Sequence, residues 1–263
     1  LSTDAGVIRF LVRDGAQLSL GGTDSSKPFE LIPSSGTSAA ASATATTLSN
    51  ASGTRRLWKF GEGTLVLSDV RYTTLDGTGT TTSQFIWSIG RGINSTDNPN
   101  NSTSPYFDGA VRGLSLSSTA ATTRNSLKDF NVSLRGGVYE IDNSNSAITD
   151  GGTLTANVGT GAGQFNFADP GSGGFSAFGG NVSVTLNGGS SLNYGTTTSW
   201  LGTADGNILM FGSQTANARI TLTNNLDLRT TGQRSILVVD NASSSSDFAV
   251  LSGTLSNTAG INK

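Results

Sequence analysis

Short apolar runs separated by turn-forming residues are the feature that most limits how this chain can fold. Most runs are about four to seven residues long, and Gly, Asn, Asp, Ser or Thr lie between them, which is typical of all-β proteins. The predicted strands are Val7–Val12, Gln17–Leu20, Gly63–Val70, Gln84–Ile89, Ala110–Leu116, Phe130–Leu134, Gly137–Ile141, Thr153–Val158, Gly163–Phe167, Asn181–Leu186, Asn207–Phe211, Ala218–Leu222, Asn225–Leu228, Ser235–Val239 and Phe248–Leu251.

The composition argues against long helices. Gly, Ser, Thr and Asn make up about half of the 263 residues, and charged residues only 13%. Ser and Asn side chains compete with the helical backbone for hydrogen bonds, and Gly loses the most entropy in a helix. No window shows helical spacing of its apolar residues. Low net charge and recurrent β-branched and aromatic residues also argue against charge-driven disorder.

Among all-β architectures, the pattern favours a parallel β-solenoid over a β-sandwich. A sandwich needs many hairpins, whose strongest signal is a two-residue Asn-Gly or Asp-Gly turn. Asp76-Gly77 and Asn187-Gly188 fit, but most connections are longer stretches of Ser, Thr and Gly. We therefore expect one domain over residues 1–263, with loop excursions at about residues 34–47 and 92–105, where the sequence is small or polar and turn-rich.

Several kinds of chemistry are excluded by residue content. The chain has no Cys and no His, which rules out disulfides, zinc-thiolate sites and His-dependent triads. A net charge of −2 and a pI near 5.0 give no basic footprint for nucleic acid. No apolar run approaches the ~20 residues that span a membrane. The chain has no initiating Met and no signal-peptide pattern, so we expect a mature or excised segment.

The end of the chain echoes its beginning. Leu48-Ser-Asn-Ala-Ser-Gly53 precedes Leu57-Trp-Lys59, and Leu255-Ser-Asn-Thr-Ala-Gly260 precedes Ile261-Asn-Lys263. Self-similarity of this kind is a mark of repeat architecture. The echo has three interpretations: one unit of a longer array, subunits that stack head to tail into an open filament, or chance similarity among common residue types.

Lys59-Phe-Gly-Glu-Gly-Thr-Leu-Val-Leu-Ser68 resembles the K-x-G-x-G-T-L-x-L-S signature of autotransporter-associated β-strand repeats. The stretch from about Leu134 to Lys263 is also similar to the long repeat proteins of that group. Further matching segments are Gly136–Glu140, Gly159–Gln164, Gly171–Gly179, Val182–Gly188, Asn224–Leu228 and Leu251–Ser256. The resemblance implies a right-handed parallel β-helix of the passenger type, exported and displayed at a bacterial cell surface, with no enzyme activity.

No catalytic or cofactor site is predicted. Polysaccharide-cleaving enzymes need converging carboxylates, whereas the acidic residues here are mostly scattered singly. Glu140 and Asp142 would share a strand face near Arg135, and we expect them to be a solvated or corner-capping pair. The sequence lacks tandem calcium motifs and a G-x-S-x-G elbow. We therefore expect no catalytic residue, no metal site and no cofactor. A carbohydrate-active β-helix enzyme remains the third functional alternative.

The favoured function is a non-catalytic extracellular subunit that self-associates end to end into a surface fibre or matrix, because the terminal runs are apolar and open strand edges pair readily. The residues expected to mediate self-association are Val7, Ile8, Phe10, Val12, Phe248, Val250, Leu251, Leu255 and Ile261. The alternative is an adhesin passenger segment that binds glycans or matrix. Tyr106 and Phe107 are expected partner contacts, and further aromatic candidates for binding sugars are Trp58, Trp87, Trp200, Tyr72 and Tyr194. Of these, Trp58 and Trp87 lie within strand-like runs, and we expect them to be packed rather than exposed.

Overall fold

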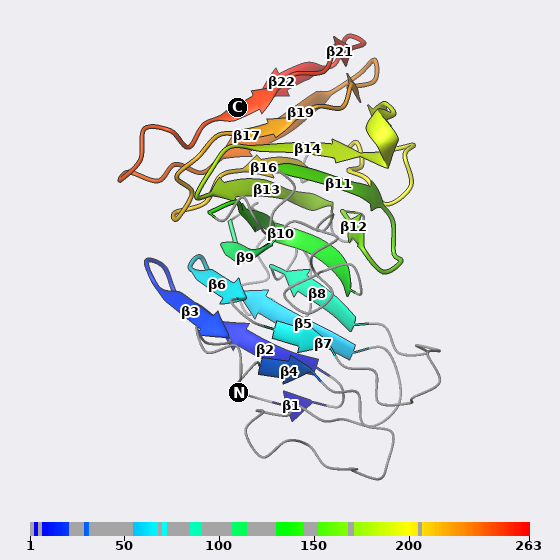
Figure 1. Cartoon of the computed structure of the whole chain (residues 1–263). Coiled ribbons are helices and arrows are strands. Elements are labelled where there is room, and N and C mark those ends of the chain that lie inside the picture. Colours follow the sequence, from blue (N-terminus) through cyan, green and yellow to red (C-terminus); the bar gives the residue numbers. More distant parts are fainter. Residues whose placement is uncertain are drawn as a thin grey trace.

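The computed structural model describes residues 3–4, 7–20, 29–31, 55–67, 70–72, 85–90, 107–114, 130–144, 152–167, 171–204 and 207–263. These ranges contain β-strands and one turn of 3₁₀ helix, η2 (Asn187–Gly189), but no α-helix. Figure 1 shows the strands stacked from β1 at one end of the molecule to β21 and β22 at the other, in a large sheet curled like a half-barrel. The predicted all-β class is confirmed.

One parallel ladder, here called the central ladder, runs through the whole stack. It comprises, in order, β3 (Gln17–Leu20), β6 (Thr64–Leu67), β9 (Ala110–Leu114), β10 (Phe130–Asp142), β13 (Ser172–Phe178), β16 (Ile208–Phe211), β19 (Gln233–Val238) and β22 (Gly260–Asn262). Each strand pairs in parallel with the next, so the ladder extends from the first layer to the last.

Other ladders flank the central one and change along the molecule. The N-terminal ladder contains β2 (Val7–Leu11), β5 (Arg55–Phe60), β8 (Phe85–Ile89), the first half of β10, and β12 (Gln164–Asn166). The flank ladder contains β11 (Thr153–Val158), β14 (Val182–Leu186), β17 (Ile220–Leu222) and β20 (Ala249–Leu251). The short ladder contains β15 (Leu192–Asn193), β18 (Leu226–Asp227) and β21 (Leu255–Ser256). β11 also pairs in parallel with β12, and β4 (Phe29–Leu31) with β7 (Val70–Tyr72); β1 (Thr3–Asp4) is antiparallel to β2.

From β13 onward the chain visits the ladders in a repeating order. It passes through the central, flank and short ladders as β13, β14, β15, then β16, β17, β18, then β19, β20, β21, and returns to the central ladder at β22. Hydrogen bonds between successive layers join residues 25 to 40 positions apart, within the ~20–50 residue period typical of solenoids. The parallel ladders are compatible with a β-solenoid and differ from the hairpin-built sandwich that was the alternative.

Strand β10 joins two ladders. The sequence predicts two strands, Phe130–Leu134 and Gly137–Ile141, but the structure has one strand of 13 residues. Its first half pairs with β8 and its second half with β9, and the register against β13 shifts between Arg135 and Val138. Gly136 lies at this bend with φ of 106°, a value that side chains other than glycine rarely allow.

The core is a column of stacked side chains. In the flank ladder Val184, Leu222 and Leu251 occupy successive layers, and in the short ladder Leu192, Leu226 and Leu255 do so. Aromatic rings fill the middle of the column, where neighbouring centroids lie 4.5–6.2 Å apart; these rings belong to Tyr139, Phe165, Phe167, Phe175, Tyr194 and Trp200. The buried tyrosines, Tyr139 and Tyr194, have a raised pKa because burial disfavours the phenolate.

Asparagine side chains connect successive layers. Asn224, which is buried, accepts a hydrogen bond from the Leu186 amide at 2.8 Å and donates to the carbonyls of Leu186 and Ser190 at 2.7 and 2.8 Å. Asn217 accepts from the Gly179 amide at 2.6 Å. Buried backbone groups at turns need such partners, so the abundant Asn residues satisfy the corners of the stack.

Candidate functional site

Three strands form the outermost layer at the C-terminal end, namely β20, β21 and β22. Each is the last member of its ladder, and within the described ranges none has a strand on its outer side. Figure 1 places this layer at the end of the stack opposite to β1 and β2. The layer is therefore an edge with unpaired backbone groups, the kind of edge at which another strand can add.

The hydrogen bonds of this layer show which backbone groups face outward. The Phe248 carbonyl accepts from the Ile220 amide and the Ser252 amide donates to the Leu222 carbonyl, so both point back into the stack. In a parallel ladder, alternate residues of a strand bond to opposite sides. Ala249 and Leu251 consequently turn their amide and carbonyl groups toward the open side.

Side chains of the outer layer continue the core column but are incompletely covered. Leu251 lies over Leu222 and Leu255 over Leu226, yet Leu222 and Leu226 are buried whereas Leu251 is half-buried and Leu255 is 41% exposed. Ile261 is likewise 41% exposed. The apolar column thus ends open, and covering these side chains would remove apolar surface from water.

The remaining C-terminal residues of the predicted self-association set lie on the same layer. Phe248, just before β20, is 52% exposed, and Val250 within β20 is half-buried. The structure therefore brings together all five predicted C-terminal residues, at one end of the stack.

The N-terminal residues of that set lie at the other end, on β2 and, for Val12, directly after it. Phe10 and Val12 are 6% and 3% exposed and belong to the core cluster, so their side chains point inward rather than toward a partner. The backbones of Val7 and Ile8 pair with β1 in an antiparallel register, and the described part of the structure does not include their side chains.

Two other leucines are exposed at this end, although sequence reasoning did not single them out. Leu11 of β2 is 56% exposed and Leu18 of β3 is 40% exposed. Leu18 stacks on Leu65, a fully buried core residue. It thus occupies an open end of the core column, as Leu255 does at the opposite end.

The aromatic candidates for sugar binding are mostly interior. Trp58 and Trp87 are buried, as their positions in strand-like runs predict, whereas the burial of Trp200 and Tyr194 corrects the expectation that they lie on the surface. The rings of Trp87, Trp200 and Tyr194 belong to the core column. Trp58 lies outside that cluster and donates from Nε1 to the Gly90 carbonyl at 2.6 Å. Phe107 is half-buried against a small apolar cluster that contains Met210. Tyr106 and the loop excursions at 34–47 and 92–105 lie outside the described residues, and Tyr72 is described only as part of β7.

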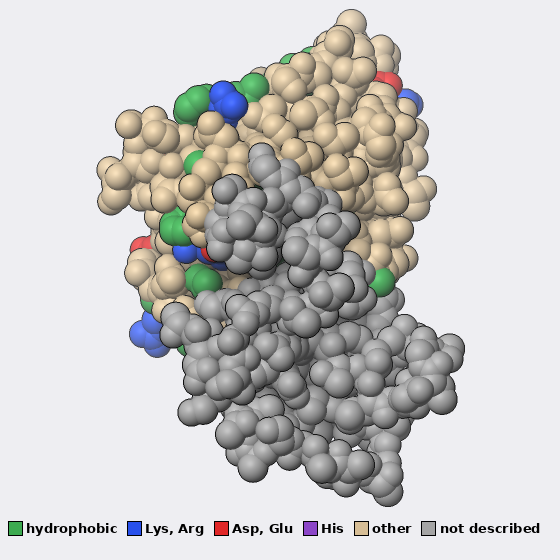
Figure 2. All heavy atoms as spheres, in the orientation of Figure 1, with side chains coloured by type: hydrophobic (Ala, Val, Ile, Leu, Met, Phe, Trp, Pro, Cys, Tyr) green, Lys and Arg blue, Asp and Glu red, His purple; other side chains and the backbone are tan. Residues whose placement is uncertain are grey.

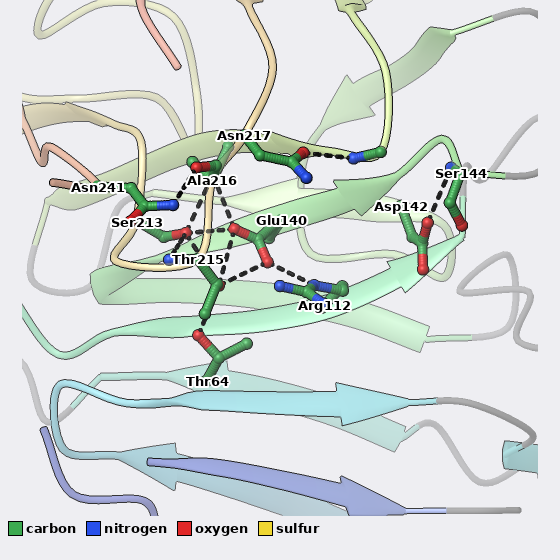
Figure 3. A network of polar contacts seen from close by, with 12 residues as sticks. Thr64, Arg112, Glu140, Asp142, Ser144, Ser213, Thr215, Ala216, Asn217 and Asn241 are labelled. Atoms are coloured by element: carbon green, nitrogen blue, oxygen red, sulfur yellow. Dashed lines mark hydrogen bonds and ion pairs between the residues drawn. The ribbon is translucent and has the colours of Figure 1, made fainter. Parts of the chain in front are cut away.

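A buried polar network surrounds Glu140 on the outer face of the central ladder (Figure 3). Glu140 is fully buried, and its Oε1 accepts from Nε of Arg112 on the neighbouring strand at 2.6 Å. Ser176 donates to Oε2 at 3.0 Å, Ser213 donates to the same oxygen, and Thr215 donates to Oε1 at 2.9 Å. Every neighbour is a donor to one carboxylate, so the arrangement neutralises a buried charge.

Glu140 and Asp142, which the sequence predicts to act as a pair, have different hydrogen-bond partners in the structure. Asp142, the last residue of β10, accepts a hydrogen bond from the Ser144 amide at 2.9 Å. Glu140 pairs with Arg112, a residue that the sequence analysis did not name, because the contact depends on strand register rather than on proximity in sequence. The described residues contain no group of three Asp, Glu, His or Cys able to hold a metal ion.

A second buried charge, Lys59, clamps a corner of the stack. Its ammonium donates to the Gly63 and Asp108 carbonyls at 2.5 and 2.6 Å and also to the Gly61 carbonyl. Lys59 and the two glycines belong to the K-x-G-x-G segment, and Gly61 adopts φ of 85°. The motif is thereby explained as a corner in which a buried cation holds together the backbone of two layers.

The exposed face seen in Figure 2 carries few charged side chains in its described part, where uncharged polar side chains and backbone dominate. Such a face offers little for electrostatic recognition of a charged partner. In the part of the chain that the structure describes, no helix is long and apolar enough to cross a membrane.

Comparison with family models, curated proteins and solved structures finds no match to this chain.

Proposed function

We propose that this chain is a non-catalytic, extracellular structural protein, a right-handed parallel β-solenoid whose terminal layers pair with those of other copies to build a surface fibre or matrix. The observation that carries the proposal is the C-terminal layer, where no strand of the described ranges covers the core side chains and backbone groups of β20, β21 and β22. An interface that joins one end of a subunit to the other end of the next does not close, and it therefore makes a filament.

The internal polar groups support a structural role. Glu140, Lys59 and Asn224 are buried and bonded to their neighbours, so each is used to hold layers together. Reactive groups in enzymes need access to a substrate, and these side chains have none. The Ser-, Thr- and Asn-rich composition and the resemblance to surface-displayed repeats support an exported location.

The test is electron microscopy of the full chain at neutral pH, with sedimentation velocity on the same sample. We expect filaments. Because neighbouring strands lie about 4.8 Å apart, the eight strands of the central ladder predict an axial repeat of about 38 Å.

Two variants identify the surface responsible. Ile261→Lys places a charge on the open edge and should shorten or abolish the filaments. Thr155→Lys adds the same charge at an exposed position in the middle of the stack and should leave them intact. Discrete monomers of the unaltered chain at high concentration would refute the proposal, and so would filaments that Ile261→Lys leaves unchanged.

A further inference from the structure

We propose that the copies join through the central ladder, with β22 of one copy pairing in parallel with β3 of the next and Ile261 lying opposite Leu18. This inference rests on the proposed end-to-end assembly and specifies its strands and register. The partner is a second copy of this chain.

Stacking along the axis brings the two ends of the central ladder together. Among the described residues, the central ladder is present at both ends of the stack, with β3 as its first strand and β22 as its last. The ladders beside the central ladder differ between the two ends of the stack. β20 and β21, which belong to the flank and short ladders, lie beside it at the C-terminal end, whereas β2 of the N-terminal ladder precedes it at the other end. Stacking two copies along the axis therefore continues the central ladder with strands of the same direction.

Both terminal strands of the central ladder carry backbone groups that face out of the stack. The Gly260 amide donates to the Gly232 carbonyl inside the stack, so the amide and carbonyl of Ile261 face outward. At the other end the Ala16 carbonyl accepts from the Thr64 amide, so Gln17 and Ser19 face outward.

These outward groups fix a register. In a parallel pair, the outward residue of one strand bonds to the two residues that flank its opposite number. Ile261 would bond to Gln17 and Ser19, the outward-facing residues of β3. Leu18 lies between these two residues and is therefore opposite Ile261.

The side chains of Leu18 and Ile261 point to the same side of the ladder. Leu18 is opposite Leu65, which belongs to the main core cluster, so Leu18 points toward the column. Ile261 is opposite Arg234, two residues before the core-packed Ile236, so Ile261 points to the same side. Leu18 and Ile261 are 40% and 41% exposed. The proposed register places these two side chains against each other and extends the apolar column from one copy into the next.

Disulfide trapping tests the register directly, because the chain contains no cysteine. The variant Leu18→Cys with Ile261→Cys places its two thiols at opposite ends of the subunit (Figure 1), so any bond must join two copies. Opposed residues in neighbouring strands have Cα atoms about 4.8 Å apart, within the ~4.4–6.8 Å range of disulfides. We expect oxidation to produce a ladder of covalent multimers that a reductant returns to monomer.

Matched variants give the controls. Leu18→Cys alone and Ile261→Cys alone can form no species larger than a dimer. Leu18→Cys with Asn262→Cys moves one thiol to the opposite face and should lose most of the multimers. Leu20 and Lys263 are also opposite each other in the proposed register, two residues further along both strands. The variant Leu20→Cys with Lys263→Cys therefore serves as the second in-register pair if circular dichroism shows that the first variant folds poorly.

The outcomes separate the two proposals. Filaments of the unaltered chain without multimers from either in-register pair would overturn the β22–β3 pairing while leaving end-to-end assembly standing. Absence of both filaments and multimers would overturn assembly itself. Multimers from both in-register pairs, together with their loss in the Asn262 variant, would establish the register.

Discussion

Removing the carboxylate of Glu140 should destabilise the middle of the stack more than any surface change. Glu140→Ala leaves the Arg112 guanidinium buried, with its side chain 6% exposed, and without its ion-pair partner. Breaking a buried pair by deleting one partner costs about 3–5 kcal/mol. Since domains are stable by about 5–15 kcal/mol, this loss is a large fraction of the total.

Removing both charges should cost less than removing one. In the variant Arg112→Met with Glu140→Leu no buried charge remains, and an apolar replacement of a buried pair is often neutral. The three hydroxyls around Glu140 keep partners, since Ser213 lies 3.3 Å from both Ser176 and Thr215. We therefore expect the double variant to be about 2 kcal/mol more stable than Glu140→Ala. Because Arg112→Met alone also breaks the pair, the coupling energy between the two positions should exceed the loss in Arg112→Met by about 2 kcal/mol.

Urea denaturation of the wild type, Glu140→Leu, Arg112→Met and the double variant gives the cycle, with Glu140→Ala measured beside them. Hydrogen exchange should accompany it, because repeat proteins unfold in parts and one midpoint can conceal a local change. The expected loss of protection is centred on β9, β10 and β13. Single-variant losses below about 1 kcal/mol, or a double variant as unstable as the sum of the singles, would refute the reasoning.

Three other results are expected. Gly174→Ala should lower the melting temperature by several degrees, because a Cβ there would lie 1.7 Å from a carbonyl oxygen of the next strand, whereas Gly260→Ala, with its nearest contact at 3.6 Å, should not. The pKa of Asp227 is lowered, chiefly by the hydrogen bond from Asn257. Its contribution to stability is therefore present above the pKa of the unfolded chain, near ~3.9, and is lost as pH falls through the lower pKa of the folded chain. Asn257→Ala should raise the pKa of Asp227 in an NMR titration. In alkaline spectrophotometric titration the two buried tyrosines, whose pKa is raised, should ionise only on unfolding. Their contribution to the stability of the folded chain is present below the pKa of an unfolded tyrosine, near ~10, and is lost as the pH rises above that pKa.

Much of the fold follows from the sequence because the stack is built of local patterns. Alternation of apolar and polar residues locates β11 and β14, whose buried and exposed positions alternate as predicted. β5 is not found in this way, because Arg55, Arg56 and Lys59 interrupt its apolar pattern and the structure buries Lys59 at a corner. Whether a lysine in a strand is buried depends on carbonyls supplied from other layers, which no local pattern specifies.

The candidate site could be predicted only in part. Leu255 and Ile261 stand in apolar positions near the end of the chain, and both are exposed on the outer layer. Leu18 escapes sequence reasoning because Gln17–Leu20 reads as an ordinary interior strand. Its exposure arises from the order of strands in the ladder, a long-range property. Phe10 and Val12 illustrate the converse, since an apolar residue in a terminal strand can point into the core.

The loop at 212–217 ties together parts of the chain that are made at very different times. Gln214 receives a hydrogen bond from the Gly15 amide and donates to Asp14, 199 and 200 positions away, and Thr215 contacts Thr64. Contacts of such high sequence separation slow folding, because a long segment must be ordered before they form. The first layers emerging from a ribosome therefore lack these contacts until more than four fifths of the chain has been synthesised, and their final locking belongs to the last stage of folding.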